Sequence, residues 1–232
     1  MFKRRQDSQA VANEILDRIE NRTGYLLEPR ELSPNIPLLT TSVQPIFPYR
    51  PIISPSTIYE LHMHQPFPPR RVGGGVCYLK DDECFEFNEY GFVYHSKLLS
   101  VHDKNNIRRI HFGGLLYQLN SYFQDTREFY KHCEYLGEIE VKVQMHNVSD
   151  HVMEGLSHNG RSMVPSLTHG ALCSESEVVA VKRCLSRDLQ SRVKRVDLVE
   201  ELIGKVLWSF DIPIDEERVR DLVRRRIDEG VR

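Results

Sequence analysis

Two histidines separated by one residue, His62 and His64, are the first side chains whose type and spacing suggest chemistry. In an extended segment alternate side chains point to the same side, so both imidazoles would face one ligand. Imidazole nitrogens bind zinc and other divalent metals, and His95, His102 or His111 could supply a third ligand. The alternative is that these histidines lie on the surface or pack partly.

The segment from residue 146 to residue 173 is rich in further potential metal ligands. They are His146, Asp150, His151, Glu154, His158, His169 and Cys173. Their spacing matches no zinc motif, so a solvated loop is the alternative to a metal site. If the loop binds an ion, Glu154 could act as the general base beside a metal-bound water. The resulting hypothesis is a metal-dependent hydrolase or nuclease that uses the 146–173 loop, with His62, His64, His151 and His158 as candidate ligands of zinc or another divalent metal.

Two arginines, Arg70 and Arg71, precede a triple glycine at residues 73–75. Glycines let backbone N–H groups converge on a phosphate, and arginines supply charge, so this segment is a candidate phosphate- or nucleotide-sensing site. It matches neither the phosphate-loop nor the dinucleotide fingerprint, because both require a following helix and here a strand is expected. The alternative is a bulge or a strained entry to a hairpin.

The C-terminal third of the chain holds the densest local groups of basic residues. They are Lys182, Arg183, Arg187, Arg192, Lys194, Arg195, Arg218, Arg220, Arg224, Arg225 and Arg226. Each contact with a phosphate would add to a salt-sensitive affinity. The alternative is a solvated helix face offset by neighbouring acids. We take Lys194, Arg195, Arg224 and Arg225, together with Arg70 and Arg71, as the candidates for nucleic-acid or anion binding.

Signatures of nucleophilic catalysis are absent from the sequence. No serine lies in a Gly-x-Ser-x-Gly elbow, which disfavours a serine hydrolase. Cys133 follows His132 directly, and adjacent helical residues point in different directions, so the two do not form a dyad. We therefore expect no catalytic residue and no cofactor in the leading interpretation.

Composition limits the classes of partner. Thirty-one basic and thirty-three acidic side chains give a formal charge of -2, so any binding of nucleic acid must use a local patch. Five cysteines without a Cys-x-x-Cys pair favour a reducing, cytoplasmic location. No apolar run approaches the roughly eighteen residues of a membrane span, and no signal-peptide core follows Met1. We expect a cytoplasmic protein without a membrane partner.

The elements that must position these side chains centre on residues 107–148. Ile139, Val141, Val143 and Met145 alternate with polar residues, which predicts a half-buried strand of an antiparallel sheet. The segment that begins at Ile107 has apolar residues at helical spacing, which predicts a long helix packed on that sheet. These residues are Phe112, Leu115, Leu116, Leu119, Tyr122 and Phe123.

Other strands and helices follow from local signals. Strands are predicted at 38–44, 76–80, 84–88, 92–99 and 177–183, and a loop at 147–176. A helix is predicted up to Asn21, and ten of the twelve prolines lie between Leu26 and Pro69, which excludes long helices there except a short one near 54–62.

Together these patterns predict an α+β fold. It has a mostly antiparallel sheet, a long central helix and a C-terminal helical hairpin broken at Pro213. We assign residues 1–190 to an α+β domain and 191–232 to the hairpin, which would dock on the domain or serve assembly with a protein partner or a second copy.

Several segments in this order resemble a known family. They are Phe2-Lys-Arg-Arg-Gln-Asp-Ser-Gln9, Val43-Gln-Pro-Ile-Phe-Pro-Tyr-Arg-Pro-Ile-Ile-Ser-Pro55, Arg71-Val-Gly-Gly-Gly-Val76, Tyr90-Gly-Phe-Val-Tyr94 and Gly137-Glu-Ile-Glu-Val-Lys-Val143. They are similar to the C-terminal half of prokaryotic proteins that carry an N-terminal Alba-like, Schlafen-type DNA-binding domain. The resemblance covers residues 2–148 and implies a sensing or assembly region that follows a nucleic-acid-associated module. That module and its acidic positions have no counterpart here, so no functional residue is carried over.

The leading hypothesis is therefore a non-catalytic binding, sensing or assembly module of a cytosolic prokaryotic protein. It would be associated with a nucleic-acid-processing or defence-type partner, with nucleic acid contacted through a local basic patch. The metal-dependent hydrolase is the alternative hypothesis.

Overall fold

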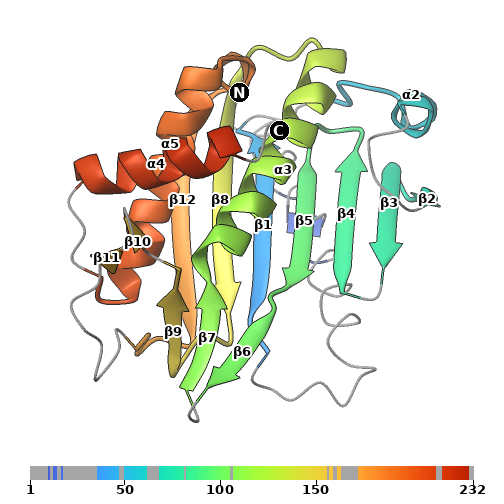
Figure 1. Cartoon of the computed structure of the whole chain (residues 1–232). Helices are drawn as coiled ribbons and strands as arrows, with labels where there is room; N and C mark the ends of the chain where they lie inside the picture. The colour runs from blue at the N-terminus through green and yellow to red at the C-terminus, as the bar shows by residue number, and fades with distance from the viewer. Residues whose placement is uncertain are drawn as a thin grey trace.

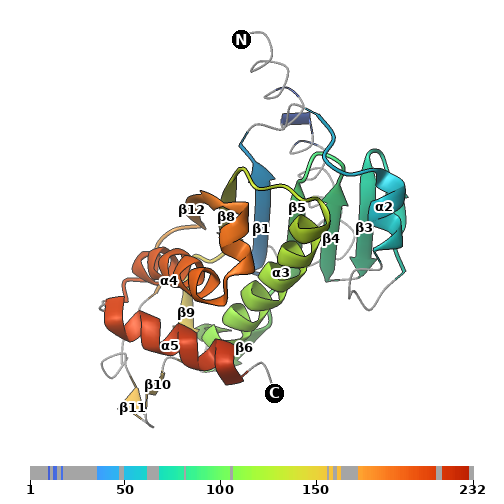
Figure 2. The ribbon, with the colours of Figure 1, turned by 90° about the horizontal axis from the view of Figure 1, so that it is seen from above.

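The computed structural model describes residues 10, 13–14, 17, 36–46, 50–61, 68–80, 82–104, 107–155, 157–158, 161–162, 172–212 and 216–229. One large sheet forms the centre of the molecule, and the three long helices all lie on one of its faces (Figures 1 and 2). The predicted α+β class is confirmed.

The large sheet has seven strands in the order β12-β8-β1-β5-β4-β3-β2. Their bounds are β1 Leu38–Pro45, β2 Arg70–Val72, β3 Gly75–Lys80, β4 Glu83–Asn88, β5 Val93–Leu98, β8 Glu138–His146 and β12 Glu177–Leu185. Every neighbouring pair is antiparallel. The predicted meander of β3, β4 and β5 is present, and β1 lies between β5 and β8.

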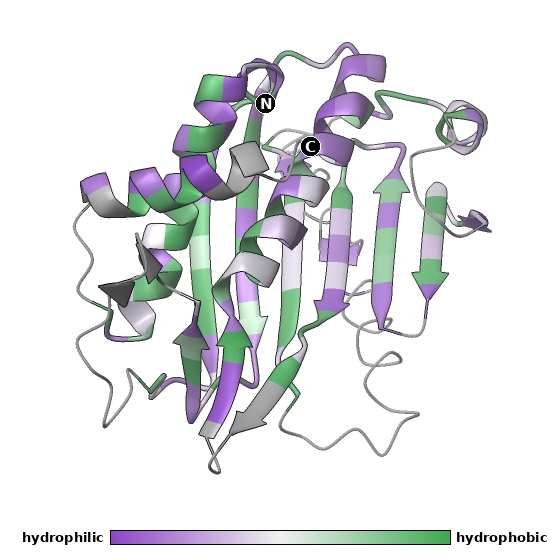
Figure 3. Cartoon of the chain, in the orientation of Figure 1, coloured by the Kyte–Doolittle hydropathy of each residue, from purple (hydrophilic) through white to green (hydrophobic). Residues whose placement is uncertain are grey.

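Strand β8 shows why the alternating pattern predicted its burial. Ile139, Val141, Val143 and Met145 are fully buried, whereas the residues between them are half-buried. Side chains of a strand alternate between faces, and Figure 3 shows the same alternation of hydrophobic and hydrophilic residues along the strands. The apolar face is the one that the helices cover.

Helix α3, Phe112–His132, is the predicted long helix. All six residues of its predicted apolar stripe are buried. Two tyrosine hydroxyls on this helix donate hydrogen bonds to backbone carbonyls next to the sheet: Tyr122 to Val93 at 2.9 Å and Tyr130 to Gly91 at 2.6 Å. These buried hydrogen bonds, in addition to the packing of the apolar stripe, fix the position of the helix on the sheet.

The helix begins later than the apolar spacing indicated. Residues Ile107–His111 form strand β7, which pairs with β6, Val101–Lys104, and in parallel with β9, His151–Glu154. The prediction of an uninterrupted loop over 147–176 was therefore wrong at β9. Such short strands carry too few residues to show a period. Two further short strands, β10 Ser157–His158 and β11 Arg161–Ser162, pair with each other.

The predicted C-terminal hairpin consists of α4, Arg192–Ser209, and α5, Glu216–Glu229, after a short 3₁₀ helix η1, Ser186–Gln190. Both helices contribute buried residues to the same hydrophobic cluster as α3 and the sheet. Lys205 of α4 donates from Nζ to the carbonyl of Val181 at 2.9 Å. This contact satisfies one backbone group of the edge strand β12 and blunts that edge.

At the N-terminal side, the short helix predicted near 54–62 is α2, Pro55–Glu60, and Ser54 caps it. Of the first predicted helix, residues 10, 13, 14 and 17 are helical, and the rest of that prediction lies outside the described residues.

Candidate anion-binding pocket

A cavity of about 230 Å³ lies between α3 and α4. The two helices run in roughly opposite directions on the same face of the sheet (Figure 1). Their facing sides line the cavity with Asn120, Phe123, Gln124, Arg127, Arg192, Arg195, Val196 and Val199.

Three of the lining residues are arginines, and none of the described lining residues is acidic. Arg127 comes from α3, and Arg192 and Arg195 come from the first two turns of α4. Nη1 of Arg195 donates to the carbonyl of Leu189 at 2.7 Å, which fixes the direction of its guanidinium group. Arg127 forms an ion pair with Glu128, the next residue of α3, which is not one of the lining residues.

The surroundings of Arg195 disfavour its positive charge. Burial lowers the pKa of its guanidinium group, and the positive charges of Arg127 and Arg192 lower it further, while Glu128 opposes them. Burial and like charges both disfavour a cation. The start of α4 adds the partial positive charge of a helix N-terminus. The pocket is therefore a favourable place for an anion.

The two ends of the cavity differ in character. Arginines gather near the start of α4, whereas Asn120 and Gln124 supply amides from α3. Between them lie the buried side chains of Phe123, Val196 and Val199. The arrangement can bind an anion at the arginine end and exchange hydrogen bonds with a ligand through the two amides at the other end.

Of the six arginines and lysines predicted to bind anions, only Arg195 lines this cavity. Lys194 pairs with Asp188 at 2.6 Å. Arg224 lies 3.6 Å from Glu200, and Arg225 is exposed on α5.

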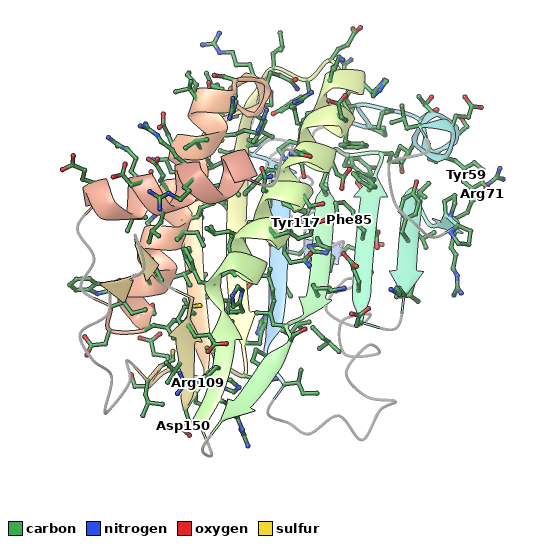
Figure 4. All side chains as sticks on the ribbon, viewed as in Figure 1. Tyr59, Arg71, Phe85, Arg109, Tyr117 and Asp150 are labelled. Carbon is green, nitrogen blue, oxygen red and sulfur yellow. The ribbon has the colours of Figure 1, made fainter. Side chains whose placement is uncertain are left out.

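The other two predicted residues, Arg70 and Arg71, lie on β2, at the opposite edge of the sheet from β12. The guanidinium carbon of Arg71 lies 4.8 Å from the centre of the Tyr59 ring (Figure 4). The six residues therefore do not form one surface.

The triple glycine next to Arg71 has a structural explanation. Gly74 has a φ of 71° in the turn between β2 and β3. A Cβ on Gly75 would come within 2.2 Å of the carbonyl oxygen of Phe87. A tight hairpin turn thus accounts for these two glycines, and anion binding by Arg70 and Arg71 stays a prediction.

The predicted metal ligands are placed only in part. His62, His64 and the side chain of His158 lie outside the described residues. His151 is buried, with Nδ1 2.9 Å from the carbonyl of Ser149 and Nε2 without a hydrogen-bond partner. Within the described part of the chain no group of three or more His, Cys, Asp or Glu side chains could hold a metal ion. The metal site stays a prediction.

A second charged cluster lies on the helix-covered face of the sheet. Glu83 Oε1 accepts from Nε2 of His95 at 2.8 Å, and Lys97 contacts both Glu83 and Asp82. Burial would raise the pKa of Glu83, but the hydrogen bonds and charges of His95 and Lys97 lower it to about 2. The ring of His95 is enclosed by Phe85 and Tyr122. Opposite charges thus satisfy one another here, as expected of a structural cluster.

Sequence reasoning missed Arg127, Asn120 and Gln124. Each lies on the polar side of an amphipathic helix, where single polar residues are ordinary. Arg192 stood in the basic segment but not among the selected candidates. The pocket could be predicted from the sequence only if it were known which face of α4 packs beside α3.

In comparisons with known proteins, no protein-family model, no curated protein and no solved structure matches this chain. The resemblance to proteins with an Alba-like, Schlafen-type domain therefore stays a prediction. Among the described residues, no helix has the length and apolar character needed to cross a bilayer.

Proposed function

We propose that this chain is a non-catalytic binding module that recognises a phosphate-type anion in the pocket between α3 and α4. The observation that carries the proposal is the convergence of Arg127, Arg192 and Arg195 on one cavity whose described lining contains no acid. In the same proposal the module serves a nucleic-acid-processing or defence-type partner, in agreement with the sequence resemblance.

Three arginines around one cavity carry an electrostatic cost. Like charges that face one cavity repel one another, and partial burial weakens the hydration of Arg127 and Arg195. The lowered pKa of Arg195 expresses this cost. An anion removes the repulsion and accepts charge-assisted hydrogen bonds, each of which contributes about 1.5–3 kcal/mol. Binding therefore gains more here than at an exposed surface arginine.

Calorimetric titration with inorganic phosphate at low ionic strength tests the proposal. We expect Arg127→Ala, Arg192→Ala and Arg195→Ala each to weaken binding by about 10- to 100-fold, the loss of one charge-assisted hydrogen bond. Added sodium chloride should lower the affinity of the wild-type protein, because salt screens partly exposed charges.

Arg70→Ala is the matched control, since Arg70 is an exposed arginine at the far edge of the sheet. It should leave phosphate binding unchanged. If phosphate does not bind, or if it binds equally well to Arg195→Ala, the pocket is not an anion site. If Arg70→Ala alone abolishes binding, the anion site lies at the β2–β3 hairpin instead.

A further inference from the structure

Strand β12 forms one edge of the large sheet (Figure 1). In an antiparallel ladder the N–H and C=O groups of one residue point to the same side of the strand, and successive residues alternate. The carbonyl of Val181 accepts from Lys205 and therefore points away from β8. By the same alternation, Glu177, Val179 and Arg183 also turn their backbone groups outward. No strand of the described part of the chain pairs with this side of β12.

The side chains of the same four residues lie in one row on the face of the sheet away from the helices. Val179 and Val181 are 47% and 38% exposed, and Glu177 and Arg183, at the two ends of the row, are also exposed. Both charged groups contact residues of β8, yet each has further hydrogen-bonding capacity, because a guanidinium has five N–H donors and a carboxylate about four acceptor sites. An edge strand with exposed valines is a template for a further strand.

The order acid, valine, valine, base is complementary to itself when a second copy of the strand runs antiparallel. Pairing centred on Ala180 places Glu177 opposite Arg183 of the second copy. It also places Val179 opposite Val181 of that copy, and all four outward-pointing residues meet outward-pointing residues. A centre one residue to either side places Glu177 opposite an apolar residue and leaves the charges unmatched. Because a two-fold interface uses the same surface twice, each favourable pair occurs twice.

Lys205 competes with a second copy for this edge. Its Nζ must release the carbonyl of Val181 before another strand can donate to that oxygen. The same Nζ lies 3.3 Å from Glu201, which remains as its partner after the release. The lysine therefore weakens the pairing of the edge without preventing it.

From this register we propose that two copies of the chain pair through the outer side of β12, antiparallel and two-fold symmetric about Ala180. The two seven-stranded sheets join into one continuous sheet, held by backbone hydrogen bonds, contacts between valines and two pairs of Glu177 with Arg183. The partner is a second copy, because a foreign strand would need the same order of charges and valines, which this chain already carries. The inference goes beyond the proposed function and does not depend on the anion pocket between α3 and α4.

Sedimentation equilibrium of the intact chain tests the pairing and should show a reversible equilibrium between monomer and dimer. Glu177→Arg and Arg183→Glu each place like charges opposite one another twice, and each should weaken the dimer by about 5- to 30-fold. The double variant carries the same pairs with their signs exchanged. It should bind at least about fivefold more tightly than either single variant.

Two substitutions with opposite expected effects distinguish this edge from any other interface. Val181→Lys inserts a charge into both pairs of valines and should weaken the dimer by more than about tenfold. Lys205→Ala leaves the carbonyl of Val181 open to a second copy and should tighten the dimer by about 2- to 10-fold. Val193→Lys is the matched control at an exposed valine on the first turn of α4 and should have no effect. Circular dichroism of each variant separates lost pairing from lost folding.

A chain that sediments as a monomer at every concentration would overturn the proposal. A dimer that Val181→Lys leaves intact, or that Lys205→Ala weakens, uses another surface and would overturn it as well. Arg195→Ala should leave the dimer unchanged while it weakens phosphate binding, so failure of the dimer and failure of the anion site are separate results.

Discussion

Neutralising Glu83 should destabilise the protein at neutral pH and remove the contribution of this carboxyl group to acid sensitivity between pH 4.5 and pH 2. The substitution is Glu83→Gln, which keeps the size of the side chain and an oxygen that can accept from His95, but removes the charge. In the wild-type protein the carboxylate contacts Nε2 of His95 at 2.8 Å and Nζ of Lys97 at 3.0 Å. These partners hold the pKa of Glu83 at about 2, below its ordinary value of 4.5.

The magnitude follows from linkage. Lowering a pKa from 4.5 to about 2 corresponds to about 3 kcal/mol at 1.36 kcal/mol per pKa unit. The side chain is 18% exposed, so solvent screening reduces the expected contribution to about 2 kcal/mol. Because the folded-state pKa is lowered, this stabilisation is complete above pH 4.5. It is lost as the pH falls through the folded-state value near 2.

Urea denaturation followed by circular dichroism at pH 7, 4, 3 and 2.5 measures the effect. The single tryptophan, Trp208, is 78% exposed, so its fluorescence is a poor probe of unfolding. At pH 7 Glu83→Gln should have a free energy of unfolding about 2 kcal/mol below that of the wild-type protein, and the difference should shrink towards pH 2.5. Glu60→Gln, at an exposed position on α2, should have no such effect. A difference that stays constant from pH 7 to pH 2.5 would refute the assignment of the acid sensitivity to Glu83.

Four further substitutions test the fold and the charge of the pocket. Gly91→Ala should lower the free energy of unfolding by about 2–3 kcal/mol in urea denaturation, because Gly91 has a φ of 84° and a Cβ there would lie 2.6 Å from Cδ1 of Ile52. Gly204→Ala should instead raise the free energy of unfolding by about 0.5–1 kcal/mol, because Gly204 lies inside α4 and nothing lies within 4 Å of an added Cβ. Tyr130→Phe should cost about 1–2 kcal/mol in the same measurement, because the carbonyl of Gly91 loses its buried partner, and an unchanged midpoint would contradict the importance of that bond. Arg195→Gln should melt at the same temperature as the wild-type protein or higher in phosphate-free, low-salt buffer, since burial and neighbouring arginines disfavour the cation, and a large loss of melting temperature would contradict the view that Arg195 is held at a cost to stability.

The sequence predicts best where one face of a long element is buried. Strand β8 and helix α3 are examples, since nine and twenty-one residues are enough to show periods of two and 3.6. The strands β7 and β9 have five and four residues and pair in parallel across a gap of about forty residues. Neither a local hydrophobic pattern nor the residues of a turn therefore predicts them. Their pairing depends on how α3 and β8, which separate them in the sequence, bring the two segments together in space.

Side chains that converge from different elements are harder to predict than the elements themselves. Arg127 and Arg192 are sixty-five residues apart in the sequence, and they meet because α4 packs beside α3. Periodicity identifies the buried face of each helix but not its neighbour on the sheet. The basic residues that the sequence singled out were chosen by local density, and density does not distinguish Lys194, which pairs with Asp188, from Arg195, which faces the cavity.

The two charged clusters on the helix-covered face of the sheet differ in a way that separates a structural role from a binding role. Glu83 and Lys97 have side chains 18% and 16% exposed, and each has an oppositely charged partner within 3.0 Å. The pocket arginines adjoin a cavity whose described lining carries no carboxylate, and the Arg127 side chain is 35% exposed. A structural network gathers charges of opposite sign, whereas an anion site gathers charges of one sign around a space that a ligand can enter. Phosphate should therefore raise the melting temperature of the wild-type protein through the pocket and leave the Glu83 cluster, with its acid transition, unchanged.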